Sequence, residues 1–203
     1  MVQKPKTECR IVSIFVFEDV DLLDVAGPAE VFGATNDVTG EALFSVQLVA
    51  QHEAPVRTTC GVQLMPDLVI ADDHFPDVLI LPGGEGSRAV AASGVAQEML
   101  VWLSKRSGVT LSVCTGARIL AAAGLLSGMH VTTHHSALDE IAALAPDAVV
   151  ESDARYTDNG RILTAAGVTA GIDLSLHLVA RLLDLDTANA VADYLEHSWQ
   201  QQG

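Results

Sequence analysis

Basic residues are scarce in this sequence: 11 lysines and arginines stand against 26 aspartates and glutamates, which gives a formal net charge of −15. Such an acidic surface repels phosphate backbones and anionic lipid, so we expect neither nucleic acid nor a membrane as a partner. Long apolar runs are absent too. The longest candidate, residues 168–183, contains Asp173, His177 and Arg181 and is too short and too polar to span a bilayer. These absences favour a protein that acts in water on a small neutral molecule.

Cysteine is also rare, and the three that occur are Cys9, Cys60 and Cys114. Their number is odd and their spacing wide, so neither a disulfide framework nor a zinc motif is predicted. Acidic residues follow the apolar run at 11–17 at once, without the small-residue cleavage site that a signal peptide needs. We therefore expect a protein of the reducing cytoplasm, with residues 1–9 as a loose N-terminal extension.

The chain is rich in apolar residues, which fall into alternating β-like and helical segments. Hydrophobic residues make up 49% of the 203 positions, enough for the core of a single domain spanning residues 1–203. Apolar and β-branched runs that end at turn residues predict strands at 10–17, 43–50, 77–81 and 109–113. Apolar spacing predicts helices at 22–35, 95–105, 115–123, 135–144, 168–183 and 187–197, and turn residues suggest hairpins at 57–65 and 156–163. The alternation predicts an α/β fold with a doubly wound, mostly parallel sheet flanked by helices.

Cys114 stands where a predicted strand runs directly into a predicted helix. Ser112 precedes it by two positions and Gly116 follows it by two, the spacing of a nucleophile elbow, in which a sharp turn presents a side chain above the carboxyl edge of the sheet. The positive end of the following helix is expected to stabilise a thiolate there. Buried packing is the commoner role of a free cysteine, and it is our interpretation of Cys9 and Cys60. For Cys114 the strand-to-helix junction favours a nucleophile.

A glycine-rich turn follows the predicted strand at 77–81. Glycine lets the chain approach a ligand closely, so the backbone N–H groups of Gly83 and Gly84 are candidates to bind a developing negative charge. Turns of this composition are common after strands, and alone the motif is weak evidence. It gains weight because a parallel sheet can place this edge beside Cys114.

Asp24 is a candidate for proton transfer because it lies in an apolar setting after the first predicted strand. A partly desolvated carboxylic acid near a thiolate has a raised pKa and can shuttle protons. A helix N-cap explains the local sequence equally well. The sequence leaves both interpretations open.

The histidines do not suggest a metal centre. His134 and His135 are adjacent, so their side chains point in different directions on a strand or a helix and make a poor chelating pair. Asp173 and His177 lie four residues apart on a helix predicted to be buried, and we expect them to bind each other. We predict neither a metal nor another cofactor.

Five segments carry a wider resemblance: LLDVAGPAEVF from residue 22, ILPGG from 80, SVCTGARILAAAGLLSG from 112, VTTHH from 131 and ILTAAGVTAGIDLSLHLV from 162. Together they resemble the ThiJ/PfpI superfamily, whose flavodoxin-like fold is that of the class I glutamine amidotransferases. Within it, Asp24 with the Cys114-Thr115 pair is similar to the isonitrile hydratase branch and to the sensor domains of AraC-type regulators. Those regulators carry a C-terminal helix-turn-helix module, which we expect this protein to do without.

The resemblance implies a hydratase that converts an isonitrile, R–NC, to an N-substituted formamide. Cys114 would attack the terminal carbon to give a thioimidate, and Asp24 would act first as general acid and then as general base. Thr115 would orient Asp24 or the intermediate. The resemblance also implies a homodimer.

Two features depart from that branch and are expected to affect the pocket. His135 stands where tryptophan is usual after Thr-Thr-His, and the segment from Glu18 to Asp21 is acidic. A redox or small-molecule sensor is the main alternative function, because a helix-terminal thiolate oxidises readily. A glyoxalase or deglycase ranks lower because that chemistry usually needs a glutamate with the cysteine. Proteolysis ranks last, since Thr115 replaces the histidine of the protease-like members.

Overall fold

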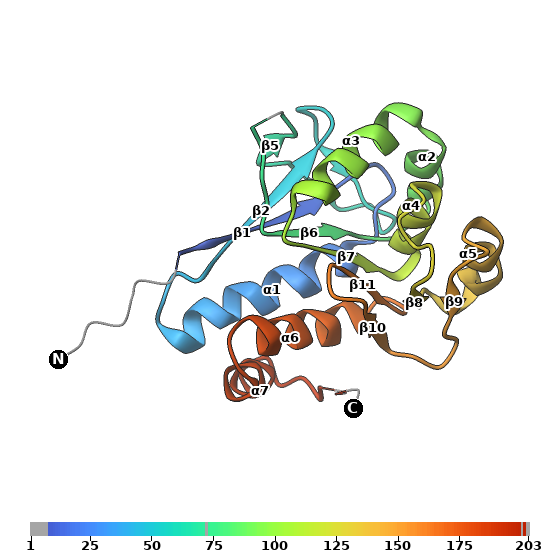
Figure 1. The fold of residues 1–203 in the computed structure, drawn as a ribbon. Coiled ribbons are helices and arrows are strands. Elements are labelled where there is room, and N and C mark those ends of the chain that lie inside the picture. The colour runs from blue at the N-terminus through green and yellow to red at the C-terminus, as the bar shows by residue number, and fades with distance from the viewer. Residues whose placement is uncertain (1–7, 72, 200, 202–203) are drawn as a thin grey trace.

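A seven-stranded sheet forms the centre of the computed structural model, which describes residues 8–71, 73–199 and 201 (Figure 1). All neighbouring strands are parallel except β10 and β11, and their order is β10-β11-β7-β6-β1-β2-β5. Their bounds are β1 Arg10–Phe15, β2 Phe44–Ala50, β5 Leu68–Val69, β6 Val78–Leu81, β7 Val109–Val113, β10 Tyr156–Asp158 and β11 Ile162–Ala165. Two small sheets pair β3 (Val56–Arg57) with β4 (Gln63–Leu64) and β8 (His130–Val131) with β9 (Val149–Val150).

The composition of β6, β7 and β11 explains their central place. Valine, isoleucine and leucine dominate these strands, and every residue in them is buried. Parallel strands that are covered on both faces need such continuous apolar runs, because neither face meets water. The core therefore lies against these strands.

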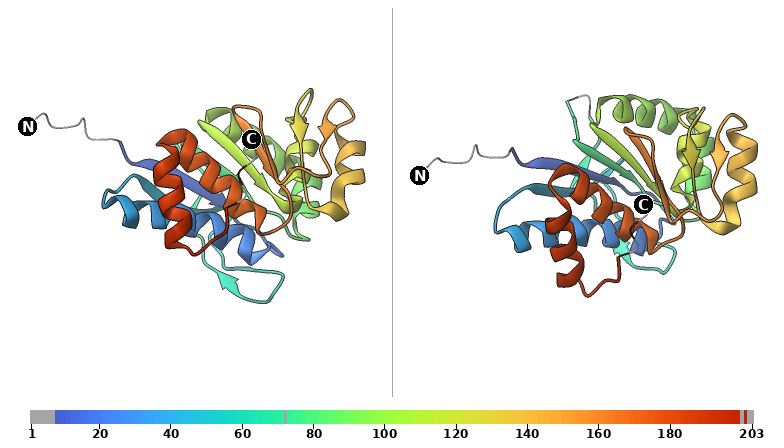
Figure 2. Two further views of the ribbon diagram at one scale, coloured as in Figure 1. Left: turned by 90° about the horizontal axis from the view of Figure 1, so that it is seen from below. Right: turned by 60° about the horizontal axis from the view of Figure 1, so that its bottom comes forward.

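Helices cover both faces of the sheet (Figures 1 and 2). One face carries α1 (Leu22–Thr39), α6 (Ala170–Leu182) and α7 (Leu185–Tyr194), and the other carries α2 (Ser87–Ala92), α3 (Gly94–Arg106) and α4 (Ala117–Ala122). Next to α4 lies α5 (Leu138–Leu144), and 3₁₀ turns at Cys114–Gly116 and His135–Ala137 lead into α4 and α5. This arrangement confirms the predicted doubly wound α/β fold.

Polar side chains and a glycine set several helix ends. At the start of α3, Ser93 Oγ accepts a hydrogen bond from the N–H of Ala96 at 3.2 Å, and Asp184 accepts one from Thr187 at 2.7 Å before α7. Gly40 ends α1 with a φ of +67°, a left-handed conformation that glycine adopts without strain. These caps satisfy backbone groups that a helix end otherwise leaves without partners.

The predicted elements occur with shifted ends. The strand predicted at 10–17 ends at Phe15, and the helix predicted at 22–35 continues to Thr39. Both predicted hairpins are found, as β3–β4 and β10–β11. Most of the predicted N-terminal extension, 1–9, lies outside the described residues. Within the part of the chain that the structure describes, no helix is long and apolar enough to cross a membrane.

The parallel register brings several loops to one edge of the sheet. Leu81 at the end of β6 pairs with Ser112 near the end of β7, and Val113 pairs with Ala165 at the end of β11. On the other side of β6, β1 runs in the same direction. The loops that follow these four strands therefore emerge side by side, at the edge where open α/β sheets bind their ligands.

Candidate active site

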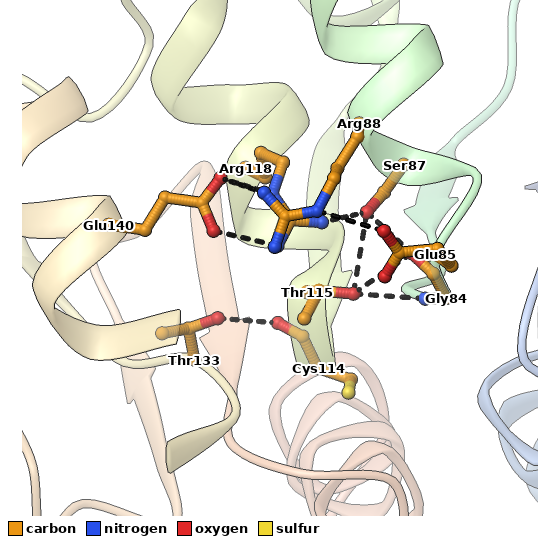
Figure 3. A network of polar contacts seen from close by, with 9 residues as sticks. All are labelled: Gly84, Glu85, Ser87, Arg88, Cys114, Thr115, Arg118, Thr133 and Glu140. Atoms are coloured by element: carbon orange, nitrogen blue, oxygen red, sulfur yellow. Dashed lines mark hydrogen bonds and ion pairs between the residues drawn. The ribbon is translucent and has the colours of Figure 1, made fainter. Parts of the chain in front are cut away.

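Cys114 follows β7 at a sharp turn. Its φ of +55° is a left-handed conformation that few non-glycine residues adopt, and it gives the turn the shape predicted for a nucleophile elbow. Gly116 is required beside it, since a Cβ there would overlap the carbonyl oxygen of Leu81. The Cys114 carbonyl accepts a hydrogen bond from Thr133 Oγ1 at 2.8 Å (Figure 3), and its N–H donates to the carbonyl of Ala166 at 2.9 Å. These contacts hold the turn in place.

Asp24 lies in the first turn of α1 and is fully buried. The helix begins at Leu22 with Asp21 in the N-cap position, so the interpretation of Asp24 as a helix cap is wrong. Its Oδ2 accepts a hydrogen bond from the N–H of Gly83 at 2.9 Å. Its Oδ1 is buried without a hydrogen bond of good geometry to any described residue. The carboxyl group thus has one fixed oxygen and one that is available for chemistry.

Burial raises the pKa of Asp24 from its ordinary value of 3.8 to about 7. The charge of Asp21 also raises the pKa. The hydrogen bonds from the Gly83 N–H and the Cys114 thiol lower it, but burial outweighs them. A group with a pKa near 7 gains and loses a proton readily at neutral pH, which suits a general acid and base. The raised pKa predicted from the apolar setting of Asp24 is therefore confirmed.

The thiol of Cys114 lacks the low pKa predicted from its place before a helix. Burial, followed by the charge of Asp24, raises the pKa from its ordinary value of 9.0 to about 11, and the hydrogen bonds from the N–H groups of Val168 and Thr115 oppose this only in part. The helix that follows, α4, has six residues, so it offers a small dipole. Cys114 is a thiol at neutral pH, and the expectation of a preformed thiolate is wrong.

Asp24 and Cys114 form a coupled pair. One carboxylate oxygen of Asp24, one of Asp21 and the Sγ of Cys114 all lie within 4.8 Å of one another. A charge on Asp24 disfavours a charge on Cys114, so the two groups titrate together rather than independently. Such a pair suits a reaction in which Asp24 takes the thiol proton while the sulfur attacks.

The glycine turn after β6 holds Asp24 and Thr115. Gly83 donates its N–H to Asp24, and Gly84 donates to Thr115 Oγ1 at 2.9 Å. A Cβ on Gly83 would come within 2.9 Å of Asp24 Oδ2 and 2.7 Å of Thr115 Oγ1, so the turn needs glycine there. Both N–H groups have acceptors inside the protein in this arrangement. Their role in binding a substrate anion stays a prediction.

A buried arginine supports this turn from α4 (Figure 3). Arg118 is 4% exposed and donates to both carboxylate oxygens of Glu140, at 2.7 and 2.8 Å. It also donates to Ser87 Oγ, which lies 3.4 Å from Thr115 Oγ1 and donates to the carbonyl of Gly84 at 2.6 Å. Hydrogen bonds between charged groups are strong and directional. The network therefore connects α2, α4 and α5 to the elbow.

Asp21, Val168 and Arg118 also belong to this site, and of these only Asp21 was anticipated, as part of the acidic segment expected to affect the pocket. Asp21 lies three residues before Asp24, a spacing that places both side chains on one side of a helix start, and this signal was available. Arg118 is a charged residue within an apolar helical run, which is a second signal. Val168 acts through its backbone N–H, so its side chain gives no indication of the role.

The predicted pairing of Asp173 with His177 is wrong. Asp173 is fully buried and binds Arg155 at 2.6 Å and His197 at 2.9 Å. His177 instead contacts Asp158 of β10 at 2.8 Å. The two residues share a helix, but each binds partners on other segments of the chain.

Two groups of residues bear on metal binding. The prediction that the side chains of His134 and His135 point in different directions is wrong: the two rings lie against each other, with centroids 4.1 Å apart, and His135 is exposed. Asp21, Asp24 and Cys114 offer two carboxylate oxygens and one sulfur, a set of donors that can hold a metal ion. The expectation that the protein binds no metal stays a prediction.

Comparisons with known proteins agree with this architecture. The model of the DJ-1/PfpI family matches residues 10–181. Isonitrile hydratase from Pseudomonas putida is 33% identical over 187 residues, which cover 92% of this chain and 78% of that protein. The HTH-type transcriptional regulator GbdR from Pseudomonas aeruginosa (strain UCBPP-PA14) is 26% identical over 185 residues, 90% of this chain but 49% of the regulator, so the chain spans about half of its length.

A solved structure gives the same result. A ThiJ/PfpI family protein from Pseudomonas syringae superimposes with a TM-score of 0.85 at 28% identity, covering 100% of this chain and 81% of that one. The family match covers most of the sequence, and the structural match covers all of it. The chain therefore belongs to the DJ-1/PfpI family.

Proposed function

We propose that this protein hydrates isonitriles to N-substituted formamides, with Cys114 as the nucleophile and Asp24 as the proton carrier. The observation that carries the proposal is the buried pair itself: a carboxylate oxygen of Asp24 lies within 4.8 Å of Cys114 Sγ, and the hydrogen bond from Gly83 to Oδ2 holds the carboxyl group in place. The similarity to isonitrile hydratase from Pseudomonas putida supports the choice of substrate class.

The first half of the reaction uses the pair as it stands, a thiol beside a carboxyl group of pKa about 7. Ionised Asp24 takes the proton of Cys114 while the sulfur attacks the terminal carbon of R–NC and forms a C–S bond. Asp24 then returns the proton to that carbon, which gives the thioimidate R–N=CH–S–Cys114. Attack and proton transfer occur together because a free thiolate is disfavoured in this setting.

The second half adds water to the thioimidate. Asp24 accepts a proton from the water as the water oxygen attacks the carbon, and it passes that proton to the nitrogen, which gives the tetrahedral adduct R–NH–CH(OH)–S–Cys114. Asp24 then takes the hydroxyl proton as the C–S bond breaks and gives it to the leaving sulfur, and R–NH–CHO is released. The N–H groups of Thr115 and Val168 face the sulfur and stabilise the charge that develops on it as it leaves. The overall addition of water is redox-neutral.

Incubation with cyclohexyl isocyanide tests this proposal, with the formamide measured by mass spectrometry. We expect formamide from the wild type and from the control variant Cys9→Ala, because Cys9 is exposed at the start of β1. We expect none from Cys114→Ala and a loss of about a hundredfold or more in kcat from Asp24→Asn, the scale of a missing general acid and base. Formamide production by Cys114→Ala would refute the assignment of the nucleophile.

A non-catalytic sensor of redox state or small molecules is the second candidate. The 26% identity with the regulator GbdR over 90% of this chain favours it. A sensor would bind an isonitrile or accumulate an oxidised Cys114 without releasing product. Intact-mass spectra after exposure to isonitriles or hydrogen peroxide separate the two: a stable modification at Cys114 without formamide supports the sensor.

The proposal includes the setting in which the enzyme works. We expect one domain that acts as a homodimer in the cytoplasm on a small neutral molecule, with no nucleic acid or membrane partner. The three free cysteines are compatible with a reducing compartment. Light scattering on the eluting protein tests the dimer, since a monomer has a mass of 21.3 kDa.

A further inference from the structure

An apolar cavity of about 410 Å³ lies beside the reactive pair. Its walls come from the start of α1, the tip of the β3–β4 hairpin and the loop after β11, and its lining residues are Asp21, Leu22, Leu23, Ala26, Thr59, Cys60 and Val168. Two of them also border the sulfur: a carboxylate oxygen of Asp21 lies within 4.8 Å of Cys114 Sγ, and the N–H of Val168 hydrogen-bonds that sulfur. The cavity therefore adjoins the reacting atoms through these two residues.

The polar side chains on the hairpin side of the cavity already have partners. Asp21 Oδ1 accepts a hydrogen bond from Thr59 Oγ1 at 2.6 Å, and the Cys60 sulfur lies 3.4 Å from Thr58 Oγ1. The rest of the lining is aliphatic, and Leu23 is 42% exposed. Covering exposed aliphatic surface of this kind with another apolar group lowers the free energy of the system. The cavity is thus suited to an apolar occupant rather than to one that needs new hydrogen bonds.

The shape of an isonitrile brings its substituent to this cavity. The R–N≡C group is linear, so when the terminal carbon contacts Cys114 Sγ the substituent projects away from the sulfur. The cavity adjoins the sulfur through Asp21 and Val168 and has a volume in the range of small-molecule sites. Asp21 also lies between the cavity and the reactive pair, where its charge repels an anionic substituent.

We propose that the cavity lined by Leu22, Leu23, Ala26, Cys60 and Val168 is the specificity pocket of this enzyme, which selects isonitriles with bulky, uncharged alkyl substituents. The inference rests on the proposed function for the reaction, but the pocket can be tested without it. Any electrophile that reacts with Cys114 through the same opening must place its own substituent there.

The first experiment compares kcat/KM for methyl and cyclohexyl isocyanide. We expect the wild type to favour the cyclohexyl compound about tenfold or more, since an added apolar group in a matching pocket has an effect of this size. Leu23→Gln should lower this preference about threefold to tenfold. Leu144→Gln is the matched control, because Leu144 is a similarly exposed leucine, 45% against 42%, on α5. Between methyl isocyanoacetate and isocyanoacetate, which are similar in size but differ in charge, the enzyme should favour the neutral ester more than about fivefold.

The second experiment measures the alkylation of Cys114 by iodoacetamide and by N-cyclohexyl iodoacetamide, with peptide mapping to separate it from Cys9 and Cys60. A preference for the cyclohexyl reagent that Leu23→Gln reduces supports the pocket even if no isonitrile is hydrated, and in that case the proposed function alone fails. Hydration at equal kcat/KM for all substituents refutes the pocket and leaves the function intact.

A remaining outcome concerns a second copy of the chain. If Leu23→Gln converts a dimer into a monomer and changes neither the substrate preference nor the alkylation preference, the cavity is covered by a partner subunit and the pocket proposal is overturned. Absence of any preference in both experiments overturns it as well.

Discussion

Replacing Asp24 by asparagine should make the protein more stable at alkaline pH while it removes activity. The pKa of Asp24 is 3.8 in an unfolded chain and about 7 in the fold. Well below pH 3.8 the group is protonated in both states and has no effect on stability. As the pH rises to 7, the unfolded state ionises first, so the free energy of unfolding of the wild type falls by about 1.4 kcal/mol per pH unit. Above pH 7 the wild type has lost about 4 kcal/mol in total.

The asparagine variant has no such loss. The substitution instead lowers the free energy of unfolding by about 1–3 kcal/mol at every pH. The reason is that its amide NH₂ takes the place of Oδ1, where a buried donor has no hydrogen-bond partner of good geometry among the described residues. The informative quantity is therefore the difference in free energy of unfolding between Asp24→Asn and the wild type as a function of pH. We expect this difference to shift by about 4 kcal/mol in favour of the variant between pH 4 and pH 8.

Urea unfolding followed by far-UV circular dichroism at one-unit pH intervals measures the difference. Asp37→Asn is the matched control, since Asp37 is an exposed aspartate of the same helix. A difference that stays constant from pH 4 to pH 8 would refute the argument, because it would mean that burial imposes no ionisation cost on Asp24.

Four further predictions concern the elbow, its support and the helix α1. Gly116→Ala should destabilise the fold by about 3 kcal/mol or more in urea unfolding, because the new Cβ meets backbone. Gly33→Ala, with open space around its position in α1, should stabilise it by about 0.5–1 kcal/mol. Glu140→Ala should lower the free energy of unfolding by about 2–3 kcal/mol, because the guanidinium of Arg118 loses its carboxylate partner. This loss is smaller than for a fully buried pair because Glu140 is 29% exposed. The alkylation rate of Cys114 should rise about tenfold per pH unit up to pH 10, given a pKa of about 11.

Each of these has an outcome that contradicts it. Equal stability of Gly116→Ala and Gly33→Ala would show that the backbone of Leu81 does not lie close to Gly116. A stable Glu140→Ala variant would show that Arg118 finds another partner, whereas recovery in the double variant Arg118→Met, Glu140→Leu would support the unpaired charge as the cause. An alkylation rate that levels off below pH 9 would show that Cys114 forms a thiolate readily.

The sequence predicts the fold well because local pattern determines it. The apolar run Val109–Val113 is a buried strand with the predicted bounds, and the turn residues at Asp158 and Gly160 produce the predicted hairpin. The elbow at Cys114 is predictable for the same reason, since its small neighbours lie two positions away. These features depend on residues that are close together in the chain.

The electrostatics of the site depend on distant residues and could not be predicted in the same way. The pKa of Cys114 is set by burial and by Asp24, which lies 90 positions earlier in the chain. The partners of Asp173 come from Arg155 and His197 rather than from its own helix. Helix position alone suggested a thiolate at Cys114, and the three-dimensional surroundings reverse that expectation.

The unequal burial of the three cysteines allows occupancy of the cavity to be followed without an added label. Cys9 and Cys60 are exposed, so the prediction that they are packed in the core is wrong, and both should react with a thiol reagent such as Ellman's within the mixing time, whereas Cys114 is 3% exposed. A reagent that approaches Cys114 in the folded protein from the cavity meets the charge of Asp21, so a dianionic reagent should release the third equivalent of chromophore slowly. An uncharged compound that fills the cavity should slow this third phase further, and the residue proposed for catalysis thereby also reports binding.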